Sequence, residues 1–209
     1  MPAYTWEEFE KVYNETKEGK NAVWKLKLKE DKMKDCHYKC MVYQKKNPGK
    51  VDFLRFESEF EGPLNIDQMF EYMINPPPDP MVTEVKQIKK DNIDSVTMYY
   101  RMKMPLCTAR DNIVRIDRKH MTPDSQFLTA STVTHPDYPV TKQSIRMYSF
   151  LSGWLRPNPE NPTNFLYSEI SHFDMKGSIP VMLMNMALSS EATVEMKNLA
   201  KWMRSVPPK

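Results

Sequence analysis

Glycine is scarce in this sequence, with only five in 209 residues. Loops that cradle phosphates need several glycines at fixed spacing, and neither GxGxxG nor GxxxxGK[ST] can be written along the chain. The formal net charge is only +3, which is too weak to indicate nucleic-acid binding but is compatible with an anionic membrane surface. Nucleotide binding through a glycine-rich loop is therefore excluded, and we expect no nucleic-acid partner.

Cysteines are also few: Cys36, Cys40 and Cys107, with no CxxC pair. An odd, sparse set is typical of free thiols in a reducing compartment. The first residues show no basic segment followed by an apolar one, so we expect no secretory signal peptide. No apolar run approaches the ~20 residues of a transmembrane helix. The sequence therefore predicts a cytoplasmic protein.

Catalytic and metal-binding motifs are missing as well. The four histidines are scattered, without HExxH or a Cys/His cluster, so we expect no metal site. Only Glu169 and His172 are candidates for the general acid or base of an enzyme, and strand alternation places them on opposite faces of their strand. We therefore expect no catalytic residues and no cofactor.

The most apolar stretch lies near the C-terminus, in residues 181–188. Before it, Gly177 suits a turn, Ser178 can cap a helix, and Pro180 suits a first helical turn. From about Ser190 onward, apolar residues recur at helical spacing, which predicts one long amphipathic helix. Its start is apolar nearly all round but too short to span a bilayer. Either protein core or a bound apolar ligand must cover it.

The rest of the chain alternates between periodic apolar segments and turn signals. A helix is expected at residues 5–18, where Thr5 and Glu8 form a capping box, and a shorter one at residues 66–74. Strands are expected at residues 22–29, 37–44, 51–60, 82–89, 95–104, 112–118, 125–135, 143–155 and 164–173.

Such a sheet must curl, and one long helix can cover it only if the sheet grips the helix. We therefore predict an α+β helix-grip fold: a curved antiparallel sheet of about nine strands, wrapped around the C-terminal helix, with an internal hydrophobic cavity. We expect residues 1–209 to form a single domain.

Three stretches then carry a resemblance to a known family. TARD at residues 108–111 follows a strand, a proline and a short loop; THPDYP at residues 134–139 is followed by SGWL at residues 152–155; and DMKGSIP at residues 174–180 leads into the last helix. In this order and spacing the sequence resembles a START domain, the lipid-transfer module related to the steroidogenic acute regulatory protein. The detail is most similar to the phospholipid-binding subgroup around phosphatidylcholine transfer protein.

That subgroup carries an Arg-x-x-Trp-Asp-like motif whose Arg meets the lipid phosphate, and here the sequence departs from it. Residues 76–80 read PPPDP, so Asp79 can match the motif but its Arg and Trp are absent. Another residue must therefore meet a phosphate, or the headgroup differs. Tyr100 and Phe150 match aromatic cage positions of the subgroup. The positions that match the buried acid–Arg pair of sterol binders are Thr97 and Ile116, which argues against a sterol.

The resemblance implies a protein that binds one lipid, most simply a glycerophospholipid of the phosphatidylcholine/phosphatidylethanolamine class, and transfers it between membranes with the C-terminal helix as lid. It also implies a monomer that contacts membranes transiently. The candidate lipid-binding residues are Tyr100, Met102, Arg146, Tyr148, Phe150, Trp154, Tyr167, Glu169, Ser171, Met182 and Met186. Arg146 is a candidate for the phosphate, or for an ion pair with Glu169. A sensor of sterol or another lipid, and a helix-grip enzyme acting on a hydrophobic small molecule, remain alternatives.

Overall fold

The structure is a computed structural model that describes residues 2–48, 50–103 and 107–205, except the side chains of residues 183 and 186–193. Its helices are α1 (Trp6–Tyr13), α2 (Met33–Cys36), α3 (Asp67–Ile74) and α4 (Val181–Ser205). Its strands are β1 (Lys25–Asp31), β2 (Tyr38–Lys45), β3 (Phe53–Phe60), β4 (Val82–Asn92), β5 (Ser95–Met102), β6 (Ala109–Thr122), β7 (Ser125–Thr132), β8 (Ser144–Arg146), β9 (Tyr148–Pro157) and β10 (Phe165–Asp174).

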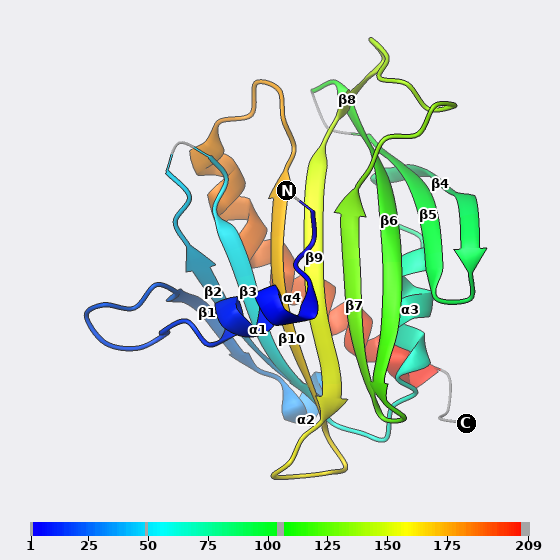
Figure 1. Cartoon of the computed structure of the whole chain (residues 1–209). Helices are drawn as coiled ribbons and strands as arrows, with labels where there is room; N and C mark the ends of the chain where they lie inside the picture. The colour runs from blue at the N-terminus through cyan, green and yellow to red at the C-terminus, as the bar shows by residue number, and fades with distance from the viewer. Residues whose placement is uncertain (1, 49, 104–106, 206–209) are drawn as a thin grey trace.

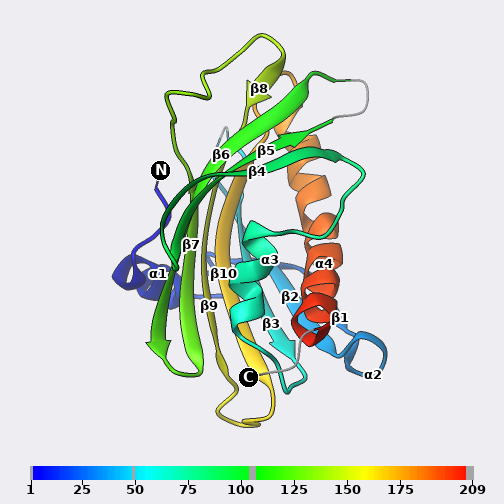
Figure 2. The ribbon, with the colours of Figure 1, turned by 90° about the vertical axis from the view of Figure 1, so that its right-hand side faces the viewer.

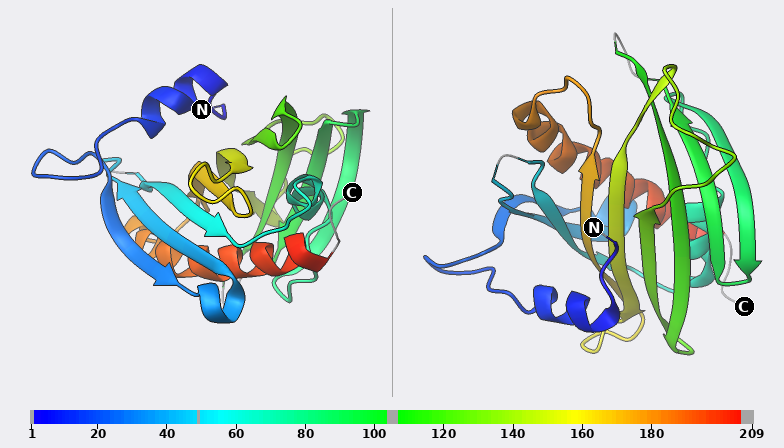
Figure 3. Two further views of the ribbon diagram at one scale, coloured as in Figure 1. Left: turned by 90° about the horizontal axis from the view of Figure 1, so that it is seen from below. Right: turned by 45° about the horizontal axis from the view of Figure 1, so that its top comes forward.

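All strands belong to one sheet (Figure 1). Its order is β1-β2-β3-β10-β9-β7-β6-β5-β4, every neighbouring pair is antiparallel, and the short β8 pairs with β6 in parallel. Figure 3 shows the sheet curving around α4, while Figure 2 shows α1 on the other side. We call the concave face toward α4 the inner face and the face toward α1 the outer face. The predicted α+β fold, with a large antiparallel sheet and a C-terminal helix, is confirmed.

The inner face holds the larger hydrophobic core. Alternate residues of the strands point toward α3 and the second half of α4, whose Met196, Leu199 and Met203 are buried among them. Helical spacing puts these three on one stripe of α4. Burial of about 25 cal/mol per Å² of apolar surface makes this contact the main force that holds the helix on the sheet.

A second core lies on the outer face, beneath α1. The capping box predicted at its start is present: the Glu8 amide donates to Thr5 Oγ1, and the Glu8 carboxylate accepts from the Thr5 amide. Phe9 is fully buried, and the Trp6 ring packs edge-on against Trp154 with centroids 5.0 Å apart. Both faces of the sheet are therefore apolar where helices cover them.

Several predicted elements differ in detail. The strand expected at residues 22–29 starts later, and a bulge between Leu26 and Leu28 interrupts its alternation, so that Trp24 joins the outer core and Leu28 the inner one. The strand expected at residues 143–155 is split into β8 and β9. The helix begins at Val181 and not at Ser178.

Candidate functional site

The most unusual feature of the inner face is a buried carboxyl on β10. Glu169 is 5% exposed, and its carboxylate accepts a 2.7 Å hydrogen bond from the hydroxyl of Tyr167. Burial raises the pKa of Glu169 to about 7, although the hydrogen bond from Tyr167 and the nearby Ser171 hydroxyl act in the opposite direction. Burial also raises the pKa of the Tyr167 hydroxyl, which therefore stays a donor.

Gly153 on β9 makes room for this pair. It lies opposite Glu169 in the ladder, and a Cβ built on it would sit 2.5 Å from the Tyr167 hydroxyl oxygen. Any larger residue would push the phenol ring away. Within the SGWL stretch, Gly153 therefore matters because its missing side chain leaves room for the Tyr167 ring.

A second tyrosine–carboxylate pair faces the sheet from the helices. Tyr72 on α3 hydrogen-bonds with Glu195 on α4, and the Glu195 charge raises the pKa of Glu169. The Glu195 residue is exposed on α4, yet desolvation of its carboxyl is the main cause that raises its pKa. Glu195 therefore belongs to a carboxyl pair with Glu169 that joins the helix to the inner face, at a point where α4 still meets solvent.

Two serines on the inner face adjoin the Tyr167–Glu169 pair. Ser58 lies opposite Tyr167 on β3, and Ser171 follows Glu169 by two residues on β10. Both are buried, and neither hydroxyl oxygen has a partner within hydrogen-bond distance, although Ser171 is near enough to favour ionised Glu169. Each leaves a buried polar atom that a ligand could satisfy.

Five of the predicted lipid-binding residues lie on the inner face: Tyr100, Met102, Tyr167, Glu169 and Ser171. The Tyr100 hydroxyl crosses to α3 and donates a 2.6 Å hydrogen bond to the Met73 carbonyl. These residues share that face because each strand contributes them at alternate positions.

Three others were expected inside the cavity but point outward. Phe150 packs against Tyr4, Trp154 packs against Trp6, and Tyr148 lies beside His172, all on the outer face. The prediction failed because the N-terminal segment covers the outer face of β9, so that its three aromatic residues are packed on that side while leucines occupy the inner one. Glu169 and His172 lie on opposite faces, as expected from alternation.

The charged candidates also have other partners. Arg146 does not pair with Glu169; its Nε donates to Asp111 Oδ1 at 2.7 Å, and its Nη2 donates to the Tyr138 carbonyl. Arg110 is fully buried and clamps the backbone by donating to the carbonyls of Met175 and Lys176.

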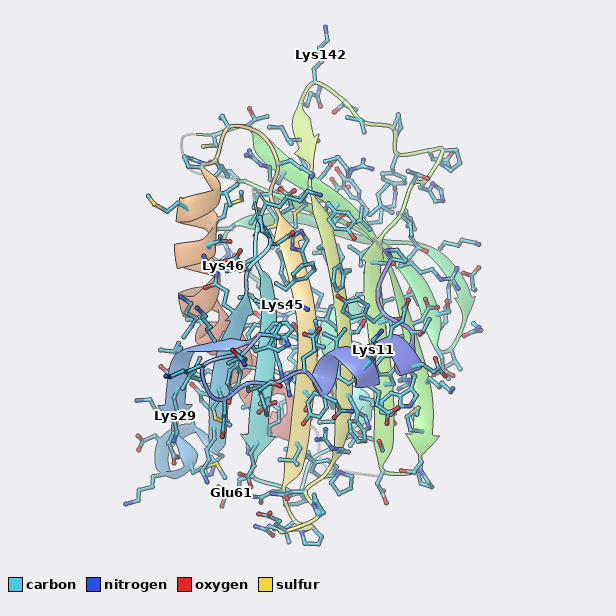
Figure 4. The ribbon with its side chains drawn as sticks, turned by 60° about the vertical axis from the view of Figure 1, so that its left-hand side comes forward. Lys11, Lys29, Lys45, Lys46, Glu61 and Lys142 are labelled. Carbon is cyan, nitrogen blue, oxygen red and sulfur yellow. The ribbon has the colours of Figure 1, made fainter. Side chains whose placement is uncertain are left out.

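The start of α4 lies beside a surface pocket of about 620 Å³. Its lining includes Lys27, Lys46, Lys50 and the 69% exposed Met182. Figure 4 shows Lys46 beside the upper part of the helix. The side chain of Met186, another predicted lipid contact, lies outside the described residues.

Sequence reasoning missed Tyr72, Ser58 and Glu195. Glu195 could have been found, because helical spacing places it on the same side of α4 as Leu199 and Trp202. An acidic residue on an otherwise apolar stripe is the signal. Ser58 gave no such signal, since its neighbourhood depends on which strands pair.

The described part of the chain contains no group of three or more His, Cys, Asp or Glu residues placed to hold a metal ion. None of the helices described there is long and apolar enough to cross a membrane.

The sequence matches the family model of the START domain over residues 5–209. Because this match covers nearly the whole chain, the protein belongs to the START domain family, whose members bind or transfer lipids. No curated protein sequence matches it significantly.

Solved structures share the fold at low sequence identity. Human STARD10 is 18% identical with a TM-score of 0.76, the match covering 98% of this chain and 82% of that one. Human StAR-related lipid transfer protein 5 is 17% identical, with a TM-score of 0.71 and coverage of 95% and 92%. The lipid transfer and protein localization domain of human StarD13 is 14% identical, with a TM-score of 0.67 and coverage of 96% and 94%.

Proposed function

We propose that residues 1–209 form one lipid-binding domain that holds a single glycerophospholipid between the inner face and α4 and transfers it between membranes. The observation that carries this proposal is the inner face itself: an apolar curved surface, covered by helices, with a polar tyrosine–glutamate cluster at its centre. An amphipathic lipid needs both parts. Two proteins with this fold, StAR-related lipid transfer protein 5 and the StarD13 domain, also carry lipid transfer in their names.

Two acyl chains supply enough free energy to keep a lipid out of water, because each buried CH₂ contributes about 0.8 kcal/mol. Release then requires α4 to move from the sheet, a gating step of the lid type. The turn between β10 and α4 carries Gly177 at a φ of 75°, and is the place where such a movement would begin.

The end of the molecule that holds the start of α4 suits contact with a membrane. Lys27, Lys46 and Lys50 surround the pocket there, and the exposed Met182 offers an apolar side chain among them. Clustered lysines beside an apolar group bind anionic lipid surfaces. We propose that the protein acts as a monomer in the cytoplasm, without catalysis, and contacts membranes through this end.

Native mass spectrometry of protein purified from lipid-containing cells tests the proposal. We expect one co-bound phospholipid per chain, and catalysed transfer of that lipid between vesicles. A co-bound sterol would replace the proposed lipid class. Empty protein that transfers nothing would refute the function.

A further inference from the structure

Two carboxyl groups, those of Glu169 and Glu195, lie at the otherwise apolar inner face. We define the acid cluster as Tyr167 and Glu169 of β10 with Tyr72 of α3 and Glu195 of α4. Each carboxylate accepts from one phenol, and the two carboxylates repel each other across the space between sheet and helices. Like charges in a low-dielectric space are costly, so the ligand-free site favours a bound proton, which a cation could replace.

No cation of the described residues supplies that charge. Neither Lys nor Arg is among the causes that set the pKa of Glu169 or of Glu195. The buried Arg55 and Arg110 and the half-buried Arg146 are engaged elsewhere: Arg55 with Glu57, Arg110 with carbonyls, and Arg146 with Asp111. The acid cluster therefore has a missing positive partner, and a lipid phosphate would find no waiting cation beside it.

Unpaired polar atoms adjoin the cluster. The Ser58 and Ser171 hydroxyls are buried on the same face without a hydrogen-bond partner. Opposite Ser58 on β2 lies Cys40, whose thiol pKa burial raises to about 11, so that it stays neutral. The site thus offers carboxylate and hydroxyl oxygens that accept hydrogen bonds, and no fixed positive charge.

We propose that the acid cluster binds the primary ammonium group of a lipid, with Glu169 and Glu195 as its ionic partners and Ser58 and Ser171 as additional hydrogen-bond acceptors. This inference rests on the proposed lipid-binding function and names the headgroup chemistry. A primary ammonium has three N–H donors and one positive charge, which fit two carboxylates and neighbouring hydroxyl oxygens. A neutral hydroxyl headgroup would leave the charges unpaired, and a quaternary ammonium has no N–H to donate.

Competitive extraction from vesicles tests this inference. Delipidated protein is incubated with vesicles that contain equal amounts of dioleoyl phosphatidylethanolamine, phosphatidylcholine and phosphatidylglycerol, then re-isolated, and the bound lipid is quantified by mass spectrometry. The three lipids share chains and phosphate and differ in the headgroup. We expect the ethanolamine lipid to be enriched about tenfold, as one charge-assisted hydrogen bond allows.

Variants separate the acid cluster from general lipid binding. Glu169→Gln and Glu195→Gln keep size and shape, and we expect each to extract lipid but to lose the preference. Glu160→Gln, at an exposed loop position, is the matched control and should keep it. Circular dichroism verifies that each variant folds.

The outcomes are distinct. If the wild type extracts lipid without a headgroup preference, or if Glu169→Gln keeps the wild-type preference, the ammonium site is refuted and the lipid-binding function stands. If the wild type extracts no lipid, the proposed function fails as well.

A second arm identifies the source of the ammonium group. Octadecylamine, and its neutral N-acetyl derivative, are each offered as competitors. Competition by the amine alone supports the ammonium site and extends it to single-chain amines; competition by neither, together with ethanolamine enrichment, restricts the site to the phospholipid headgroup. Equal competition by both compounds would overturn the assignment of ammonium.

Discussion

The carboxyl of Glu169 makes the stability of the ligand-free protein depend on pH. Its pKa is about 7 in the folded state against a reference of 4.5. Below pH ~4.5 both states hold the proton; between these values the folded state keeps it while the unfolded chain releases it, so stability falls as pH rises. We expect the free energy of unfolding, relative to Glu169→Gln, to fall by about 3 kcal/mol between pH 4 and pH 8.

Urea unfolding of both proteins across this range measures the difference. Other titrating groups are common to both and cancel, and Glu160→Gln controls for loss of an exposed carboxylate. If the free energy of unfolding changed with pH in the same way for the wild type and for Glu169→Gln, the pKa of Glu169 would not be raised in the folded protein.

Gly153→Ala tests how the Tyr167–Glu169 pair is positioned. The added methyl would sit within 3 Å of the Tyr167 ring and hydroxyl, so the phenol must move. We expect a loss of about 1–3 kcal/mol in stability. The pH window of the Glu169 effect should also move upward, because the hydrogen bond from Tyr167 lowers the pKa of Glu169.

Gly19→Ala is the comparison for this variant. Gly19 has a φ of 83° and nothing near its Cβ position, so the substitution costs backbone strain alone. It should leave the pH window unchanged. If Gly153→Ala lost stability over the same pH range as the wild type, the close contact between Gly153 and the Tyr167 ring would be contradicted.

At this scale, sequence reasoning succeeded on one strand and failed on its neighbour. Strand alternation placed Tyr167, Glu169 and Ser171 of β10 on one face, as the structure has them. It could not orient Phe150 and Trp154 of β9, because both faces of that strand are buried and neither carries a clear polar pattern. Partners such as Asp111 for Arg146 depend on the order of strands in the sheet, which local sequence does not encode.

Among the elements, the connection between β10 and α4 is held mainly by one side chain. Arg110 reaches from β6 and donates to the carbonyls of Met175 and Lys176 at 2.9 and 3.1 Å. We expect Arg110→Ala to free the start of α4 and to speed lipid release about tenfold, the effect of a loss of ~1.4 kcal/mol. Release of a fluorescent phospholipid into acceptor vesicles measures this rate.

Arg115→Ala is a suitable control. Arg115 makes partly exposed ion pairs with Asp91 and Asp117, which contribute little to stability. Its release rate should match the wild type. If Arg110→Ala also matched the wild type, the Arg110 clamp would not govern the lid.

The elements themselves were largely predictable from sequence. Alternating apolar residues, proline and glycine turns and the capping box located the strands and helices. The bulge in β1 and the break between β8 and β9 were missed, because each depends on backbone pairing: the amide of Met147, between the two strands, donates to the carbonyl of Asp111 on β6. The four-residue α2 was also missed, because it lies in a short charged stretch without an apolar period.

For the whole molecule, the lysines near the start of α4 should control the encounter with membranes. Each lysine near an anionic surface contributes about 1 kcal/mol of attraction. We expect the double variant Lys46→Glu/Lys50→Glu to transfer lipid from anionic vesicles at least about tenfold more slowly, and to lose most of its salt dependence.

The double variant Lys90→Glu/Lys119→Glu changes the net charge equally at the opposite end of the sheet, where β4 meets β5 and β6 meets β7. Its transfer rate should stay near that of the wild type. Equal slowing in both variants would indicate that overall charge, and not this end of the molecule, governs the encounter.

The sheet is open, so its two edge strands, β1 and β4, could in principle pair with strands of other molecules. β1 exposes Lys25, Lys27 and Lys29, and β4 is interrupted by three register shifts along a mostly exposed strand. Charged side chains and bulges stop an edge strand from pairing with another sheet. A chain that opens its helix at a membrane would therefore stay dispersed, because its exposed edges cannot template an aggregate while its apolar interior is uncovered.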